Sequence, residues 1–253
     1  MLGKRTEQPV FIPTQTQQEA LCRLLYEVES GEPATTFSGA AGSGRSTVLQ
    51  QLLRELQSVC ASTLRVPAAS LDESAMLMQL SDALAADLPR QSTRGERLCR
   101  VRDELLSRGR CGQRQVLLFD DADLAFDDAV QLLRFVNSVA QQSDGMLSVI
   151  HVSRSVLVPG LGSSSGLRVA LMPLSHDESA EFVSRWLIVN GFASGNVQRS
   201  AIEAIAVLAS GNVSRLLQFC ELLAIVQQTA PETLIDETTV QSVERELMSR
   251  VAA

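Results

Sequence analysis

The sequence predicts an α/β protein with a parallel sheet flanked by helices, followed by a small all-helical domain. Apolar, strand-like runs alternate with helical stretches as far as residue 174, a pattern typical of parallel strands joined by crossover helices. From Ser175 onward the apolar residues follow a helical period alone. A chain of 253 residues can bury a substantial core in one large domain or two unequal ones. We therefore expect an α/β domain over residues 1–174 and a helical domain over residues 175–253.

The α/β part can be divided into helices and strands by its capping residues, its glycines and its apolar runs. A capping-box pattern, Thr14 with Gln17 or Thr16 with Glu19, opens a first helix that ends near Gly31. The remaining expected elements, in order, are a strand at 35–38, a helix to about 58, a strand at 62–66, helices at 71–88 and 95–107, a strand at 115–119, a helix to 141, and strands at 146–152 and 167–171. The expected helices of the second domain span 176–189, 198–209, 213–227 and 237–248.

A glycine-rich loop lies between the first strand and its helix. Gly39 and Gly44 have the spacing of a phosphate-binding P-loop, with Ser46 as the hydroxyl that ligates Mg²⁺. Glycines let backbone N–H groups converge on an anion, and the helix N-terminus adds unpaired donors. The predicted nucleotide-binding residues are Gly39, Ala41, Gly42, Ser43, Gly44, Arg45, Ser46 and Thr47.

One P-loop position departs from the pattern, because Arg45 stands where lysine is usual. Its planar guanidinium is bulkier than a compact ammonium and fits a tight loop less well. Lys4 is the single lysine of the sequence, so part of this departure can reflect a lineage that favours arginine.

The apolar run at 115–119 ends on two acids, Asp120 and Asp121. A continuous apolar run is typical of a central parallel strand covered on both faces. We expect this strand to lie beside the P-loop strand, where Asp120 would hold Mg²⁺ together with Ser46. The alternative is that these acids cap a helix, a role that Asp127 or Asp128 is expected to take for the helix ending near residue 141.

This order of P-loop, acid-ended strand, strand ending in a polar residue and helical lid resembles an AAA+ ATPase module. The likeness is to the bacterial general secretion pathway A type and to related transposition and origin-binding ATPases. It is carried by residues 19–31, the P-loop, 116–124, 148–154, 173–175 and 209–212. The resemblance implies binding of ATP with Mg²⁺ and its hydrolysis to ADP and phosphate. It places Asp121 at the catalytic base and Ser153 at the sensor that orients the attacking water.

Four departures from that family pattern argue for slow turnover. Besides Arg45, Asp121 replaces a glutamate and so withdraws the base by about 1 Å, a displacement that can cost roughly a hundredfold in rate. Ser214 stands at the sensor-2 arginine position, and Arg215, about 100° further round the helix, is the remaining candidate for phosphate contact. Residues 162–166 replace the expected arginine pair, leaving only Arg168.

Composition indicates the compartment and the kinds of partner to expect for such a module. No apolar run has the length of a membrane span, and a signal-peptide core is missing, so a cytoplasmic protein without membrane insertion is expected. The five cysteines are scattered without metal-ligand spacing, which favours reduced and mostly buried thiols. A net charge of −7 weighs against DNA as a partner without excluding it.

An arginine-rich segment lies outside the family pattern, comprising Arg90, Arg94, Arg97, Arg100, Arg102, Arg108, Arg110 and Arg114. It is either a solvated face with internal ion pairs or a docking surface for an acidic partner or DNA. Three functions stay open at this point. They are an ATP-binding switch or assembly factor with weak hydrolysis, a competent ATPase of a secretion or envelope complex, and a DNA-associated regulator of transposition or replication. A protein partner is expected, and self-association stays open.

Overall fold

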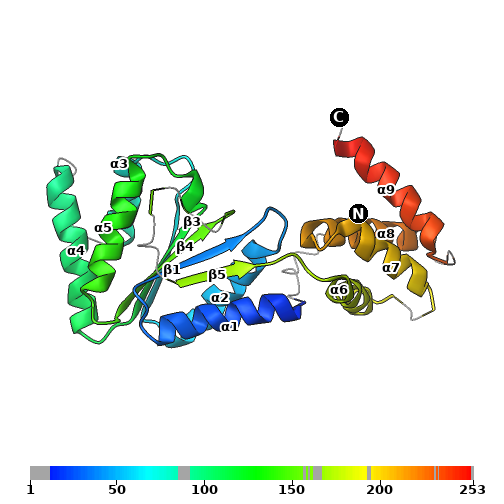
Figure 1. Cartoon of the computed structure of the whole chain (residues 1–253), viewed down its shortest axis with the longest axis horizontal. Coiled ribbons are helices and arrows are strands. Elements are labelled where there is room, and N and C mark those ends of the chain that lie inside the picture. Colours follow the sequence, from blue (N-terminus) through cyan, green and yellow to red (C-terminus); the bar gives the residue numbers. More distant parts are fainter. Residues whose placement is uncertain are drawn as a thin grey trace. The chain divides into compact units, whose positions relative to one another are not determined.

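The computed structural model describes residues 12–84, 92–155, 158, 160–161, 167–192, 195–230, 232 and 234–251, with side chains as far as residue 247. The chain divides into two compact units (Figure 1). The sheet unit comprises Glu19–Ala41 and Val48–Leu171. The helical unit comprises the residues up to Gln18, Gly42–Thr47 and the chain from Met172 onward.

The sheet unit is built on parallel strands in the order β2-β3-β4-β1-β5. These strands are β1 (Ala34–Gly39), β2 (Ser62–Pro67), β3 (Gln115–Asp120), β4 (Leu147–Ser153) and β5 (Leu167–Leu171). The register pairs Ser38 of β1 with Ser153 of β4, and Pro67 of β2 with Asp120 of β3. Because all the strands run the same way, their carboxyl ends lie at one edge of the sheet.

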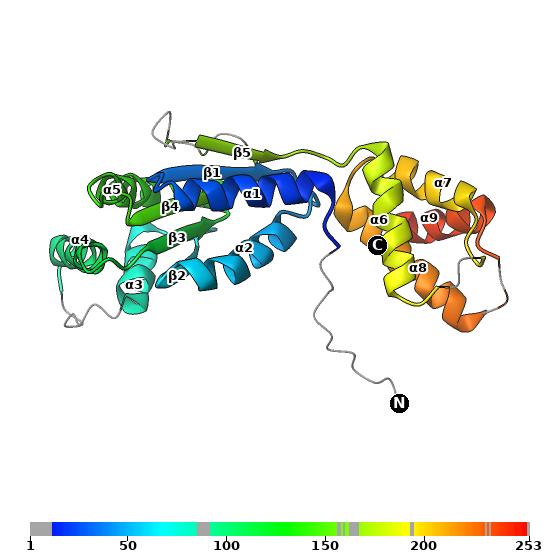
Figure 2. The same ribbon diagram turned by 90° about the horizontal axis from the view of Figure 1, so that it is seen from below.

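Two helical layers cover the sheet (Figures 1 and 2). One face packs against α3 (Glu73–Ala83), α4 (Arg94–Arg110) and α5 (Ala129–Gln141), and the other against α1 (Gln15–Glu29) and α2 (Arg45–Val59). Strand β3 shows how the sequence achieves this, since Leu117 and Phe119 join the first core and Val116 and Leu118 the second. A strand buried on both faces reads as a continuous apolar run, as predicted.

The helical unit contains α6 (His176–Val189), α7 (Arg199–Ala209), α8 (Val213–Thr229) and α9 (Glu237–Val251) around a separate apolar core. Ser175 and Glu178 form a capping box at the start of α6, and Asn212 caps α8 by accepting from the Arg215 N–H. The beginning of α1 belongs to this unit as well. There Thr14 and Gln17 form the reciprocal capping bonds that the sequence suggested, while Thr16 instead binds the Glu178 carboxylate at 2.8 Å.

The expected elements agree with the structure to within a few residues at most ends. The expected helix at 71–88 is the least accurate, because α3 begins at Glu73 and ends at Ala83, and residues 85–91 lie outside the described part. Asp128 caps α5 with its carboxylate on the Ala129 N–H, as expected for one of the two candidate acids. The prediction of mostly buried thiols is wrong. Cys220 is buried and Cys60 half-buried, but Cys22, Cys99 and Cys111 are exposed on helix surfaces or ends, and all are free.

His151 is a buried polar residue inside the sheet. Its ring stacks on Phe119 with centroids 5.8 Å apart, and its Nε2 lies 2.8 Å from Asn137 Oδ1. Burial disfavours the imidazolium and lowers the pKa of His151 to about 4. This environment, between an aromatic ring and an asparagine amide, is that of a core histidine.

We expect acid to destabilise the fold through this histidine. The unfolded chain takes up the proton below about pH 6.5, whereas the folded chain does so only near pH 4, so stability is unaffected above 6.5 and falls between the two. The loss should reach about 3 kcal/mol. Denaturant unfolding from pH 7 to 4 should show a shallower pH dependence in His151→Gln than in the parent. Equal slopes in the parent and in His151→Gln would contradict the assignment.

Candidate functional site

The glycine-rich loop connects β1 to α2, and α2 begins at Arg45. Gly42 and Gly44 have φ angles of +79° and +87°, in the left-handed region that favours glycine. Ser43 between them is buried, and its Oγ has no hydrogen-bond partner. Positive-φ glycines at the start of a helix, next to an unsatisfied hydroxyl, make a suitable cradle for an anion.

Both glycines also lie close to side chains from elsewhere in the chain, which would have to shift to admit a Cβ. A Cβ on Gly42 would lie 2.4 Å from Asn212 Oδ1, and one on Gly44 would lie 2.4 Å from Gln17 Nε2. The Gly42 carbonyl accepts a hydrogen bond from the Ser214 N–H at 3.1 Å. These residues all belong to the helical unit as defined above. The P-loop backbone is therefore in contact with the first turn of α8.

The residues around the sensor-2 position lie in that first turn. Ser214 reaches the P-loop through its backbone N–H, and its side chain is exposed. Arg215 is half-buried and donates its N–H to Asn212 Oδ1 at 3.1 Å. The structure thus brings Ser214, at the position where the resemblance leads one to expect an arginine, to the loop.

The acid-ended strand occupies a different place from the one expected. β4 lies between β1 and β3, so the strand of Asp120 is not beside the P-loop strand. Hydrophobicity could not order the two strands, because β3 and β4 are both buried along their length. Asp120 and Ser153 nevertheless end neighbouring strands at the carboxyl edge that β1 shares.

Asp120 is held by a cation that the sequence analysis missed. Arg65, on the neighbouring strand β2, donates Nε to Asp120 Oδ2 at 3.2 Å and also directs Nη2 at the same oxygen. Only 15% of the Asp120 side chain is exposed, against 50% for Arg65. The sequence signal that could have revealed this pairing is a basic residue within two positions of the end of β2, because β2 ends at the same edge of the sheet as β3.

Asp121 and Ser153 have constrained surroundings. Asp121 adopts a left-handed conformation, φ 50° and ψ 44°, and donates its N–H to Asp120 Oδ1 at 3.0 Å. Ser153 is fully buried and donates its hydroxyl to the Ser155 carbonyl. Its hydrogen-bond proton is therefore committed within its own loop, and its oxygen is left to accept.

The arginine-rich segment is largely engaged in local contacts. Arg94 binds Glu73, Arg102 binds Asp103, and Arg108 binds both Glu104 at 2.8 Å and the Leu84 carbonyl at 2.7 Å. Arg114 donates to the Glu29 carbonyl at 3.0 Å. These contacts favour the solvated, internally paired interpretation. Arg90 and the segment 162–166, where the arginine pair was found to be missing, lie outside the described residues, and Arg168 is exposed on β5.

The fold and the loop together define a class of protein. A P-loop after the first strand, a sheet with β4 inserted between the P-loop strand and the acid-ended strand, and a following helical unit are the parts of an AAA+ P-loop NTPase. The family description "AAA ATPase domain" matches residues 14–150, more than half of the chain. The chain belongs to the AAA ATPase family.

One curated relative of the chain is a secretion pathway protein. The chain is 27% identical over 209 residues to General secretion pathway protein A from Aeromonas hydrophila, covering 79% of this chain and 38% of that protein. The chain therefore spans well under half the length of this relative.

Solved structures show the same fold at low sequence identity. Cdc6p from Pyrobaculum aerophilum matches with a TM-score of 0.71 at 16% identity, covering 90% of this chain and 66% of that one. The Aeropyrum pernix ORC1 protein, solved in complex with DNA, gives 0.69 at 18%, covering 94% and 68%. The Thermotoga maritima RuvB Holliday junction branch migration motor gives 0.63 at 16%, covering 92% and 68%.

The described part of the chain offers neither a membrane span nor a preformed metal cluster. None of its helices combines the length and the apolar character needed to span a membrane. Its His, Cys, Asp and Glu side chains form no group of three or more placed to hold a metal ion by themselves.

Proposed function

We propose that this protein binds ATP with Mg²⁺ and hydrolyses it slowly, acting as a nucleotide-dependent switch or assembly factor. The observation that carries the proposal is the pair of positive-φ glycines, Gly42 and Gly44, at the start of α2; a second observation is that Arg65 already offsets the charge of Asp120. The loop provides the backbone N–H groups that nucleotide binding needs. The ion pair with Arg65, in contrast, weakens Asp120, an acid that hydrolysis needs. The departures at Arg45, Asp121 and Ser214 act in the same direction.

The parts of the loop have distinct roles in this proposal. The backbone N–H groups of residues 41–46 surround the β- and γ-phosphates, and Arg45 adds a positive charge. Gly39 closes the strand, and Thr47 continues the helix. Ser46 and Asp120 hold Mg²⁺, which neutralises phosphate charge when it is bound. Asp121 serves as the base, Ser153 positions the water through its free acceptor, and Arg215 approaches the phosphates from α8.

The setting of the switch is also part of the proposal. The secretion-associated relative supports a cytoplasmic role with a protein partner in a secretion or envelope complex. We retain the division into an α/β domain at 1–174 and a lid at 175–253. The contact between Ser214 and Gly42 gives nucleotide binding a means of altering the lid, because phosphates entering the loop would meet the first turn of α8.

The second candidate is a DNA-associated regulator, favoured by one observation. The archaeal ORC1 structure that shares this fold was solved in complex with DNA. The net charge of −7 and the internal pairing of the α4 arginines weigh against it here. Titration of a labelled duplex at two salt concentrations separates the candidates, because phosphate contacts produce a steep salt dependence.

Thermal unfolding with nucleotide tests the main proposal. At Mg-ATP about a hundredfold above its Kd, linkage should add roughly 2.7 kcal/mol to the free energy of unfolding. Ser46→Ala should lose most of this gain through loss of the metal ligand. Ser58→Ala, on the same helix with its hydroxyl on the Glu55 carbonyl, is the matched control and should retain it. An unchanged melting temperature for the parent at millimolar Mg-ATP would remove the basis for a nucleotide site.

A further inference from the structure

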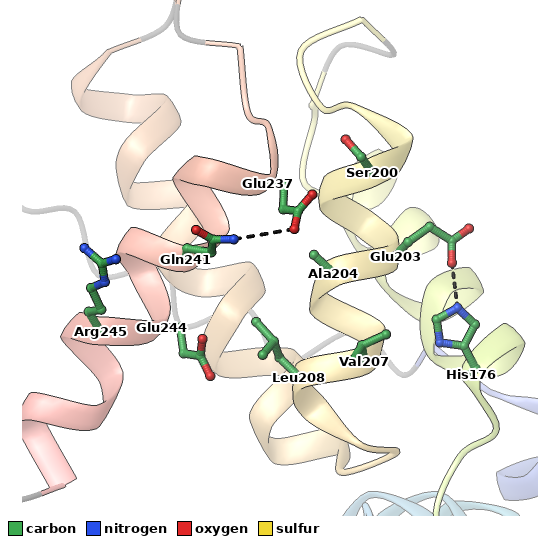
Figure 3. A pocket seen from close by; sticks show the side chains of 10 residues that line it. All are labelled: His176, Ser200, Glu203, Ala204, Val207, Leu208, Glu237, Gln241, Glu244 and Arg245. Atoms are coloured by element: carbon green, nitrogen blue, oxygen red, sulfur yellow. Dashed lines mark hydrogen bonds and ion pairs between the residues drawn. The ribbon is translucent and has the colours of Figure 1, made fainter.

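The helical unit carries a groove that shares no residue with the nucleotide site. It has a volume of about 690 Å³ and lies between α7 and α9, with His176 at its margin (Figure 3). Figure 3 shows Ala204 and Leu208 on the α7 side and Glu237 between the two helices. The groove is formed by one face of each helix, at positions 200, 203, 204, 207 and 208 of α7 and 237, 241, 244 and 245 of α9.

The groove combines an apolar wall with an acidic rim. Ala204, Val207 and Leu208 form the wall: 63% of Val207 is exposed, whereas Ala204 and Leu208 are half-buried and pack on one side against the unit's own core. The spacing of these residues places them along one side of the helix. Apolar residues aligned on an exposed helix face are characteristic of a binding surface.

Three glutamates surround this wall, with Arg245 as the opposing charge on α9. Glu203 is engaged by His176 at 2.6 Å and by Arg199 at 3.4 Å, and the hydrogen bond from His176 is the main cause that lowers its pKa. Among the described residues, Glu237 and Glu244 form no ion pair, although Glu237 accepts a hydrogen bond from Gln241. Two carboxylates beside an apolar wall are therefore available to cations of a binding partner.

We propose that this groove is a docking site for a basic amphipathic helix of a partner protein. Two parallel walls of helix surface receive a third helix along its apolar face, the arrangement of helix-in-groove recognition. The apolar residues of the ligand would lie on Ala204, Val207 and Leu208, and its lysines or arginines would face Glu237 and Glu244. This inference is independent of whether the P-loop binds nucleotide.

A second copy of this chain matches the groove less well. Its arginine-rich helix is α4, but Val101 and Leu105 of that helix are fully buried in the sheet unit, and Leu98 and Leu106 pack against the same core. The α4 helix of a second copy could therefore offer arginines to the rim but only half-buried leucines to the apolar wall. An amphipathic helix of another protein satisfies both.

The test uses the full chain and a synthetic helical peptide with leucines on one face and lysines and arginines on the other. Fluorescence anisotropy should show binding, and the double change Glu237→Lys and Glu244→Lys should weaken it by about tenfold or more. Val207→Asp should weaken it similarly, and because Val207 is exposed the fold should be retained. The matched control is Glu55→Lys with Glu221→Lys, an equal charge change at exposed sites elsewhere, which should have about a twofold effect or less.

A second measurement needs no variant. Adding the peptide should slow amide hydrogen exchange in α7 and α9 of the parent and leave β3 and α5 unchanged. Equal weakening by the control pair would show general charge attraction and overturn the proposal. It would also be overturned if the chain alone self-associates in sedimentation and the groove changes, but not the control pair, abolish that association, because a second copy would then be the occupant.

Discussion

Changing Arg45 to lysine and Asp121 to glutamate together should raise steady-state phosphate release by about tenfold or more at saturating Mg-ATP. This corresponds to a barrier lower by roughly 1.4 kcal/mol. Lysine restores a compact donor for the phosphates, and glutamate restores the reach of the base toward the water. Because both groups act on the same transition state, the gain should exceed the sum of the two single effects.

The backbone conformation of Asp121 means that the stability of each variant has to be measured along with its turnover. Asp121 occupies a left-handed conformation, which aspartate tolerates better than glutamate does. Asp121→Glu should therefore lower stability slightly, by about 1 kcal/mol, even where it improves turnover. Both single variants, the double variant and the parent should be compared below their melting temperatures. A parent that already turns over several times per second, and is slowed by both changes, would show that Arg45 and Asp121 are adapted catalytic residues.

Most of the fold could be predicted because its elements are strongly patterned. The helices of the second unit follow a clear apolar period, and their expected spans nearly coincide with α6 to α9. Strand β3 was evident as an apolar run ending in acids. The Thr14 and Gln17 capping box could likewise be predicted, since its bonds join residues three apart and depend on local sequence alone.

The order of the strands could not be predicted, for a physical reason. β3 and β4 are both buried on two faces, so each reads as an apolar run without any mark of its neighbours. The insertion of β4 between β1 and β3 depends on packing between residues far apart in sequence. The same applies to Gln17 and Asn212 at the P-loop, which reach Gly44 and Gly42 from distant parts of the chain.

Arg65 was missed because the pairing that gives it meaning is between strands. In sequence it is one arginine in a short, half-exposed strand, 55 residues before Asp120. Only the β2–β3 register brings its guanidinium to that carboxylate. The basic side chain beside Asp120 could therefore not be predicted from the sequence alone.

Replacing Asp120 by asparagine should weaken Mg-ATP binding by about a hundredfold, because the metal loses its carboxylate ligand. Replacing Arg65 by glutamine should instead strengthen Mg-ATP binding. An ion pair with a half-exposed partner is worth up to about 1 kcal/mol, so releasing Asp120 from Arg65 should strengthen Mg-ATP binding by up to roughly fivefold. The gain should disappear when Mg²⁺ is removed by a chelator, because nucleotide alone does not use the acid.

The double variant distinguishes neutralisation of Asp120 by Arg65 from direct contact between Arg65 and the phosphates. If Arg65 acts by neutralising Asp120, Arg65→Gln should have no effect in the Asp120→Asn background, since the charge that it offsets is gone. If Arg65 instead contacts the phosphates, its loss should weaken binding in both backgrounds. Isothermal titration with Mg-ATP on the four proteins measures this coupling, with Arg100→Gln, an exposed arginine on α4, as the control for net charge. Weaker binding by Arg65→Gln in the parent would exclude competition with Mg²⁺ and make Arg65 part of the phosphate site. Stronger binding by Arg65→Gln in the parent, and no effect in the Asp120→Asn background, would indicate that Arg65 competes with Mg²⁺ for the Asp120 carboxylate.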